Sequence, residues 1–264
     1  MLQRTMTSTS PDVLIGLSVI PSSRSTRARR ASRWSGRRPH GPAIRLTESG
    51  PSPTTITSRL RRSFSGSFGA SPFQTVESAL KSKDPYTWGH CKRVGAFASG
   101  IARCLGLTGD RIVHIRIAGE FHDVGKIGVP ERLLRKRGPL TANEYRQVMA
   151  HPAVGERILR LLLPDGHPIL GAVRSHHERY DGHGGPDGLA SEEIPMGARI
   201  VAVADAFDAM TSTRPYRPRL KLDTALKELE ENAGSQFDPE CVRALQQLYP
   251  DHSPVEPSQV AVPA

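Results

Sequence analysis

The stretch His122-Asp123-Val124-Gly125-Lys126-Ile127-Gly128-Val129-Pro130 organises the rest of the chain. It places an imidazole beside a carboxylate at the end of a helical pattern, and a lysine between two glycines follows. Imidazole and carboxylate groups bind divalent metals, and an ammonium group binds phosphate as a point charge. The stretch therefore indicates a metal site that faces a phosphate.

The segments around this stretch read as helices. Apolar residues recur at three- and four-residue steps from Thr75 to about Tyr249, and no strand-like alternation is visible. Helices are expected over 87–105, 110–121, 142–150, 152–162, 168–179 and 196–210, and from residues 223 and 238 onward. The predicted fold is all-α, a single bundle of about seven or eight helices.

Several helix ends carry recognisable signals. Asp110 and Asp238 are expected to cap helices, and Thr141 with Glu144 has the pattern of a capping box. Pro152 suits the first turn of a helix, where its missing N–H is harmless. Gly234 is expected to close the helix that Asp223 opens.

The basic charge is confined to the N-terminal part of the chain. Residues 1–74 hold twelve arginines and two acids, which accounts for the whole formal charge of +10. This Arg-, Ser- and Pro-rich segment lacks apolar periodicity, so 1–74 is predicted to be a disordered extension, 75–249 the folded domain and 250–264 a disordered tail. A solvated extension or an over-extended reading frame is preferred over a transit peptide or a basic arm that touches nucleic acid or lipid.

Other features narrow the class of protein. No specific nucleic-acid binding is expected from the folded domain, because its own charges balance. The apolar run 13–20 is too short to span a membrane. Three widely spaced cysteines indicate neither a disulfide framework nor a thiolate zinc site, so a reducing cytoplasm is expected.

Six of the ten histidines lie in chemical context, whereas His40, His114, His167 and His252 are expected to be surface or core histidines. Two carboxylates, Asp205 and Asp208, stand three residues apart in an otherwise apolar helix. A buried carboxylate needs a cation or strong hydrogen-bond donors. His183 lies in a glycine-rich loop and is left out of the candidate ligands. That candidate set is His90, His122, Asp123, His151, His176, His177 and Asp205. Five imidazoles and two carboxylates are about enough for two metals.

The order of these residues resembles the metal-dependent HD phosphohydrolase superfamily, and the surrounding motifs resemble its HD-GYP branch, the bacterial phosphodiesterases for cyclic di-GMP. The resemblance covers about 75–248. Its markers are Asp84-Pro85-Tyr86-Thr87-Trp88-Gly89-His90, His122 to Gly128, His176-His177-Glu178-Arg179-Tyr180-Asp181-Gly182, Ala204 to Ser212 with Arg214-Pro215-Tyr216-Arg217, and Phe237-Asp238-Pro239.

The resemblance implies a two-metal site with Asp123 as the bridge. It places His90, His122 and Asp205 mainly on one metal, and His151, His176 and His177 on the other. A water activated by two cations would attack the phosphorus. Iron or manganese is expected for both divalent ions.

The resemblance also implies roles for residues around the metals. Asp123 and Lys126 are the expected catalytic residues, with Lys126 on the phosphate. Arg214 and Arg217 are candidates for the second phosphate or a guanine edge, with a surface cation pair as the alternative. Glu178 and Asp208 are expected to orient the ligands, and Asp181 to shape its loop through backbone N–H groups.

Two positions depart from the branch pattern. The chain reads Gly184-Gly185-Pro186, with glycine where the branch has tyrosine. That loss would soften the loop if the tyrosine shapes it, or change activity or specificity if the tyrosine contacts partner or substrate. Tyr86 stands where some members place a glutamate for a third metal, which favours two metals.

The function implied is hydrolysis of cyclic di-GMP to linear pGpG, GMP or both. An HD hydrolase for another cyclic dinucleotide or nucleotide, and a non-catalytic binding module, are the alternatives. Expected partners are the substrate and diguanylate cyclase-type proteins, and a homodimer is left open.

Overall fold

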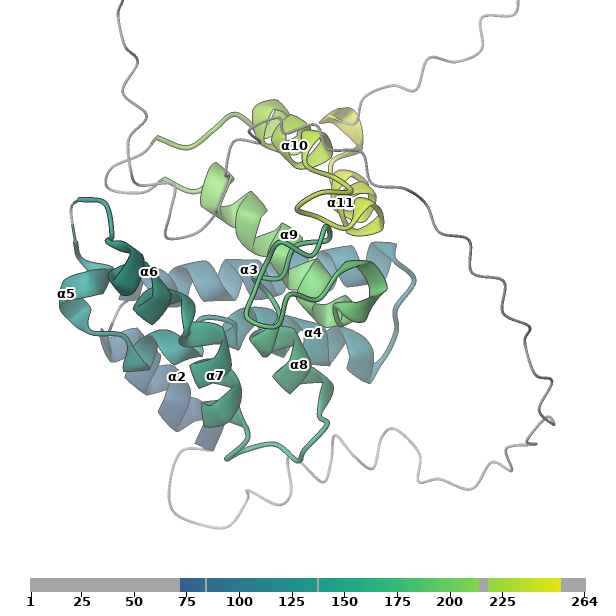
Figure 1. Cartoon of the computed structure of the whole chain (residues 1–264). Coiled ribbons are helices and arrows are strands. Elements are labelled where there is room, and N and C mark those ends of the chain that lie inside the picture. The colour runs from purple at the N-terminus through teal and green to yellow at the C-terminus, as the bar shows by residue number, and fades with distance from the viewer. Residues whose placement is uncertain (1–71, 84, 137, 214–217, 253–264) are drawn as a thin grey trace, which may run out of the picture. The chain divides into compact units, whose positions relative to one another are not determined.

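A computed structural model describes residues 72–83, 85–136, 138–213 and 218–252. The all-α prediction is confirmed, because every regular element among these residues is helical (Figure 1). The α-helices are α2 (Pro72–Lys83), α3 (Pro85–Cys104), α4 (Asp110–Phe121), α5 (Glu131–Leu134), α6 (Ala142–Met149), α7 (His151–Leu159), α8 (Pro168–Arg174), α9 (Met196–Thr211), α10 (Leu222–Glu231) and α11 (Pro239–Gln246). Three 3₁₀ turns accompany them: η2 (Val124–Gly128), η3 (Ser191–Glu193) and η4 (Pro250–His252).

The main core lies between α3, α4, α8 and α9. Helix α9 is apolar on most of its surface, and its residues from Val203 to Phe207 are all buried. Helices α3 and α4 approach closely at Gly95 and Gly119, where neither residue has a side chain. A Cβ on Gly119 would lie only 2.9 Å from Gly95 Cα. Each fully buried aliphatic side chain of this core stabilises the fold by about 1.5–3 kcal/mol.

Two of the predicted caps are confirmed. Thr141 Oγ1 accepts from Glu144 N at 3.3 Å while Glu144 Oε2 accepts from Thr141 N at 2.8 Å, which is the capping box. Asp238 accepts from Glu240 N at 2.8 Å and caps α11. The prediction for Asp110 is wrong by one residue, because Gly109 precedes α4 with a φ of 56° and Asp110 is the first helical residue.

Some helix limits also differ from the sequence pattern. The expected helix 168–179 ends earlier, at Arg174, so that His176 and His177 lie in the turn after α8. Helix α10 begins at Leu222, one residue before Asp223, and ends at Glu231. Gly234 lies in the following turn with a φ of 81°.

Two helices were not anticipated from the periodicity. Helix α2 begins three residues before the expected start of the domain, and its Phe73 ring lies 5.5 Å from that of Phe121. Helix α5 is a single turn, which packs in a small separate cluster formed by Val129, Leu133 and Val148. The described residues thus hold ten α-helices.

Some predictions fall outside the described residues. Arg214 and Arg217, the segment before Pro72 and the residues after His252 belong to this group, as does the side chain of Tyr86. The domain limits therefore stay predictions. Among the helices that are described, none has the length and apolarity required for a membrane span.

Candidate metal centre

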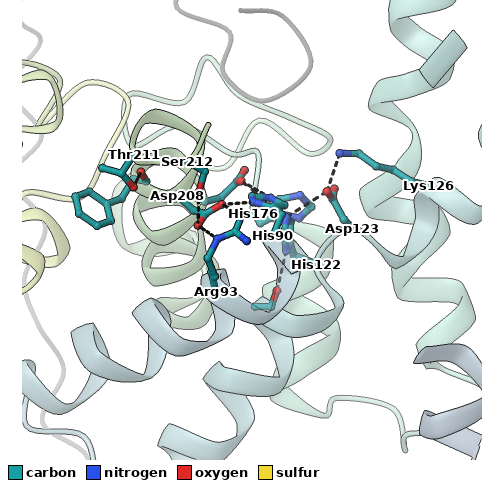
Figure 2. A network of polar contacts seen from close by, with 12 residues as sticks. His90, Arg93, His122, Asp123, Lys126, His176, Asp208, Thr211 and Ser212 are labelled. Carbon is teal, nitrogen blue, oxygen red and sulfur yellow. Dashed lines mark hydrogen bonds and ion pairs between the residues drawn. The ribbon is translucent and has the colours of Figure 1, made fainter. Parts of the chain in front are cut away.

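The candidate ligands come from five helices or their ends, and all but His177 are buried. Figure 2 shows His90, His122, Asp123 and His176 gathered in one place. His90 comes from α3 and Asp205 from α9, whereas the others lie at helix ends. Ligand atoms within 4.8 Å of one another form two groups. One group is His90, His122 and Asp123, and the second is His151, His176 and His177.

Three of the histidines are held in the same way. The Nδ1–H of His122 donates to Gly119 O at 2.8 Å, that of His151 to Val148 O at 2.8 Å, and that of His176 to Val173 O at 2.7 Å. In each case the acceptor is the carbonyl three residues earlier, at the end of a helix. Because a carbonyl can only accept, the proton sits on Nδ1 and the Nε2 lone pair faces the centre.

The Nε2 lone pairs of these rings face no hydrogen-bond donor that the described residues supply. Among the described residues, His122 Nε2 is buried without a hydrogen-bond partner. His151 Nε2 lies 3.3 Å from His176 Nε2, and with both protons on Nδ1 the two lone pairs face each other. A cation between such lone pairs turns an unfavourable arrangement into a favourable one. The donor set therefore fits divalent metals.

Asp123 belongs to the first group and also faces the second. Its Oδ1 is 3.2 Å from His151 Nε2 and its Oδ2 is 3.4 Å from His122 Nε2. One carboxylate thus faces both clusters, which is the arrangement that a bridging ligand needs. Asp205 Oδ1 lies 3.0 Å from His90 Nε2 and 3.9 Å from His122 Nε2, on the side of the first cluster.

His90 is oriented by a carboxylate rather than by a carbonyl. Its Nδ1 lies 2.7 Å from Asp208 Oδ2, and Arg93 holds Asp208 from the other side through Nε at 2.6 Å and a terminal nitrogen at 3.0 Å (Figure 2). Ser212 Oγ adds a hydrogen bond to Asp208 Oδ1 at 3.1 Å. Such a carboxylate fixes the ring and raises its basicity as a ligand. Asp208 therefore contacts a candidate ligand, and its orienting role in a metal site stays a prediction.

The protonation of the candidate ligands follows from burial and nearby charge. Burial and the neighbouring histidines hold the pKa of His176 well below its ordinary value, and burial with His151 lowers that of His177 to about 3. Burial also lowers the pKa of His90, but hydrogen bonds to Asp205 and Asp208 outweigh it and raise that pKa to about 9. His176 and His177 are therefore neutral and ready for a metal, whereas a metal must displace a proton from His90.

Lys126 lies at the edge of the centre. Its Nζ donates to Asp123 Oδ2 at 2.6 Å, and 15% of its side chain is exposed. Burial lowers its pKa, but the Asp123 charge dominates and raises it, so the ammonium stays charged. Burial alone would raise the pKa of Asp123. The nearby charges of Lys126 and His122 outweigh burial and hold that pKa well below its ordinary value. Asp123 is therefore ionised.

The turn η2, which carries Lys126, packs tightly against the start of α7. A Cβ on Gly125 would lie 1.9 Å from His151 O and 2.6 Å from Gly155 N. Only glycine allows the backbone of the Asp123 turn to approach the backbone of the His151 helix so closely. The two groups of candidate ligands are therefore connected by this backbone contact as well as by Asp123.

Glu178 and Asp181 contact the loop after the histidine pair. Glu178 Oε1 accepts from Asp187 N at 2.6 Å and from Gly188 N at 3.1 Å, while its Oε2 is buried and unpartnered among the described residues. Asp181 Oδ1 accepts from His183 N at 3.1 Å, as expected of a loop-shaping aspartate. These bonds fix the loop, and an orienting role of Glu178 toward the histidines stays a prediction.

The loop is held without help from a side chain at 185. Gly185 N donates to His177 O at 3.3 Å, and Arg174 holds Asp187 through bonds of 2.7 and 2.8 Å. A Cβ on Gly184 would lie 2.5 Å from Glu178 Cα, whereas one on Gly185 would meet nothing within 4 Å. The glycine at 184 is therefore required by close approach, and the position at 185 has room for a side chain.

The sequence interpretation missed Arg93 and Arg174. Arg93 follows His90 by three residues on the same face of α3, which is a readable signal once His90 is a candidate ligand. Arg174 has no comparable signal, because its partners Glu156 and Asp187 lie 18 and 13 residues away.

A family model described as HD domain matches residues 74–241. A cyclic di-GMP phosphodiesterase response regulator, RpfG of Xanthomonas campestris, is 43% identical over 63% of this chain and 44% of its own length. A cyclic di-GMP phosphodiesterase of Thermotoga maritima is 42% identical over 63% of this chain and 45% of its length. The 3'3'-cGAMP-specific phosphodiesterase 3 of Vibrio cholerae is 41% identical over 65% of this chain and 38% of its length.

Solved structures agree in fold. Bd1817, an HDG"Y"P protein from Bdellovibrio bacteriovorus, matches with a TM-score of 0.50 and 18% identity over 61% of this chain and 51% of that one. The V-cGAP3 structure from V. cholerae matches with a TM-score of 0.50 and 19% identity over 66% of this chain and 46% of that one. The chain spans less than half the length of the three curated relatives. It belongs to the HD domain family.

Proposed function

We propose that this domain is a two-metal phosphodiesterase that hydrolyses cyclic di-GMP to linear pGpG, GMP or both. The observation that carries the proposal is Asp123, whose two carboxylate oxygens face two separate groups of histidines. Two divalent ions held there would activate a water and neutralise charge on the phosphate. Iron or manganese suits this set of imidazoles and carboxylates.

The residues around Asp123 each have a defined task in this proposal. His90, His122 and Asp205 would hold one ion, and His151, His176 and His177 would hold the other. Asp208 orients His90 and fixes its Nδ1 proton through the 2.7 Å contact. None of these residues acts as the nucleophile.

Lys126 is assigned to the phosphate. Its ammonium is paired with Asp123 Oδ2 at 2.6 Å. An ion on Asp123 would compete for the same carboxylate charge, and the ammonium would then be available to a phosphate oxygen at the partly exposed edge. Arg214 and Arg217 stay candidates for the second phosphate or a guanine edge.

The choice of cyclic di-GMP follows the relatives. Two of the relatives named above are cyclic di-GMP phosphodiesterases, and the third is specific for 3'3'-cGAMP. A substrate of the second kind is therefore the specific alternative. Both molecules are cyclic dinucleotides with two phosphodiesters, so the same metal centre would serve either.

The test is hydrolysis by the full chain loaded with Mn²⁺ or, without oxygen, Fe²⁺. Cyclic di-GMP and 3'3'-cGAMP are supplied separately and products are separated by chromatography, beside an Asp123→Ala variant. We expect turnover of cyclic di-GMP that falls at least about 10³-fold in the variant, because a shared ligand of both ions is lost. Preference for 3'3'-cGAMP would replace the proposed substrate, and equal turnover in both proteins would refute the proposed site.

A further inference from the structure

The helix α2 ends on a lysine that contacts the Asp123–Lys126 turn. Lys83 Nζ lies 3.2 Å from Lys126 O, 2.5 Å from Ile127 O and 3.0 Å from Val129 O. A lysine ammonium has three N–H donors and no acceptor, so three carbonyls match its full capacity. Hydrogen bonds from a charged donor are also stronger than neutral ones. Lys83 is therefore a specific anchor and not a solvated helix end.

The carbonyls that Lys83 contacts belong to the turn that presents Lys126. Within this turn Lys126 N donates to Asp123 O at 2.9 Å, and Val129 N donates to Lys126 O at 3.1 Å. Ile127 packs against the small cluster of Leu80 and Trp88, so α2 contacts the turn through apolar groups as well. The start of the turn is fixed by Gly125 against α7, and its end is fixed by Lys83.

We propose that Lys83 is a positioning residue that sets the reach of the Lys126 ammonium toward the phosphate. The inference rests on the proposed role of Lys126. Lys83 donates all three N–H groups to backbone carbonyls, so it acts through the turn and does not touch the substrate. Helix α2 then belongs to the phosphate-binding apparatus and is more than a connection from the N-terminal residues.

The test compares four full-length variants: Lys83→Met, Lys126→Met, the double variant, and Lys81→Met as the matched control. Lys81 lies in the same last turn of α2, and its side chain is exposed. Turnover is measured with cyclic di-GMP and with bis(p-nitrophenyl) phosphate, a phosphodiester without a base. We expect Lys83→Met to lower kcat by about tenfold to a hundredfold, as misplacement by about 1 Å does. Metal content should stay at the wild-type level, and Lys81→Met should match wild type.

The double variant decides whether Lys83 acts through Lys126. We expect Lys83→Met to lower kcat by less than about twofold once Lys126 is already methionine, because coupled residues are not additive. Independent, multiplicative losses would overturn the inference. Turnover of the model diester with the same pattern, but none of cyclic di-GMP, would reject the proposed substrate and leave the role of Lys83 standing.

Hydrogen exchange supplies a readout that needs no activity. Peptides covering 124–130 should exchange faster in Lys83→Met than in wild type or Lys81→Met, since the anchor of the turn is gone. Exchange in 151–159 should stay unchanged, which shows that the fold is intact. Equal exchange of 124–130 in Lys83→Met and Lys81→Met would overturn the inference, even in a protein without measurable turnover.

Discussion

The substitution Gly125→Ala tests whether the relative position of the two groups of candidate ligands depends on the close contact between η2 and α7. The added Cβ would lie 1.9 Å from His151 O, 2.6 Å from Gly155 N and 2.8 Å from His151 C. All three atoms are backbone, so no side-chain rotation relieves the overlap. Moving His151 O out to the 3.0 Å that Cβ contacts tolerate takes about 1.1 Å.

That displacement is large for a metal site, where ligand distances hold within about 0.2 Å. It would carry His151 away from Asp123 Oδ1, which now lies 3.2 Å from His151 Nε2. A misplacement of about 1 Å lowers turnover by about 10²-fold, or about 2.7 kcal/mol in the activation barrier. Overpacking should also lower the free energy of unfolding by about 1–3 kcal/mol.

The matched control is Gly128→Ala in the same turn. A Cβ there meets only Val154 Cγ1 at 3.3 Å, which a small side-chain adjustment relieves. Turnover, metal content by mass spectrometry and thermal unfolding are measured for both variants. We expect Gly125→Ala to lose metal from the second cluster while Gly128→Ala resembles wild type. Full metal content and turnover in Gly125→Ala would refute the claim that this contact aligns the clusters.

Three further predictions concern other parts of the site. Asp208→Asn should weaken metal binding by about 10- to 100-fold in a chelator competition, because the carboxylate that orients His90 loses its charge. The control Asp165→Asn, at a side chain that is 84% exposed, should leave metal affinity unchanged. Protein stripped of metal with a chelator should lose stability as pH rises from 6.5 through about 9, since the raised pKa of His90 means that the folded state holds a proton that the unfolded state releases. The unfolding temperature of a His90→Gln variant should depend less steeply on pH over that range, and an unchanged slope would contradict the assignment. The free energy of unfolding of Gly185→Tyr should lie within about 0.5 kcal/mol of the wild-type value, because that position is open. Gly184→Ala should be clearly less stable, because its Cβ would overlap backbone atoms. The reverse order of stability in urea denaturation would contradict the loop geometry.

The helical fold was readable from local patterns, and the same patterns singled out the candidate ligands. Three-to-four-residue periodicity predicts helices, and the pairs His122-Asp123 and His176-His177 stand out because they lie where that periodicity ends. The structure brings all seven candidate ligands together, and their roles as ligands stay predictions. Three of them, His122, His151 and His176, lie at helix ends and donate Nδ1–H to the carbonyl three residues earlier, a group that is left over at the end of a helix.

The contacts that hold the ligands could not be read from the sequence. Lys83 contacts carbonyls 43 to 46 residues away, and a carbonyl has no signature in the sequence. The need for Gly125 depends on the distance to α7, which only the packed fold determines. Helix α2 escaped prediction because its apolar residues Phe73, Val76 and Leu80 form a short pattern beside a polar, basic segment.

The central claim is that Asp123 joins two metal-binding clusters in one centre. The most direct test counts manganese ions per chain after equilibrium dialysis, in the wild-type protein and in Asp123→Ala. The account predicts two ions in the wild type and at most one in the variant. One ion or none in the wild type, or two retained in Asp123→Ala, would contradict it.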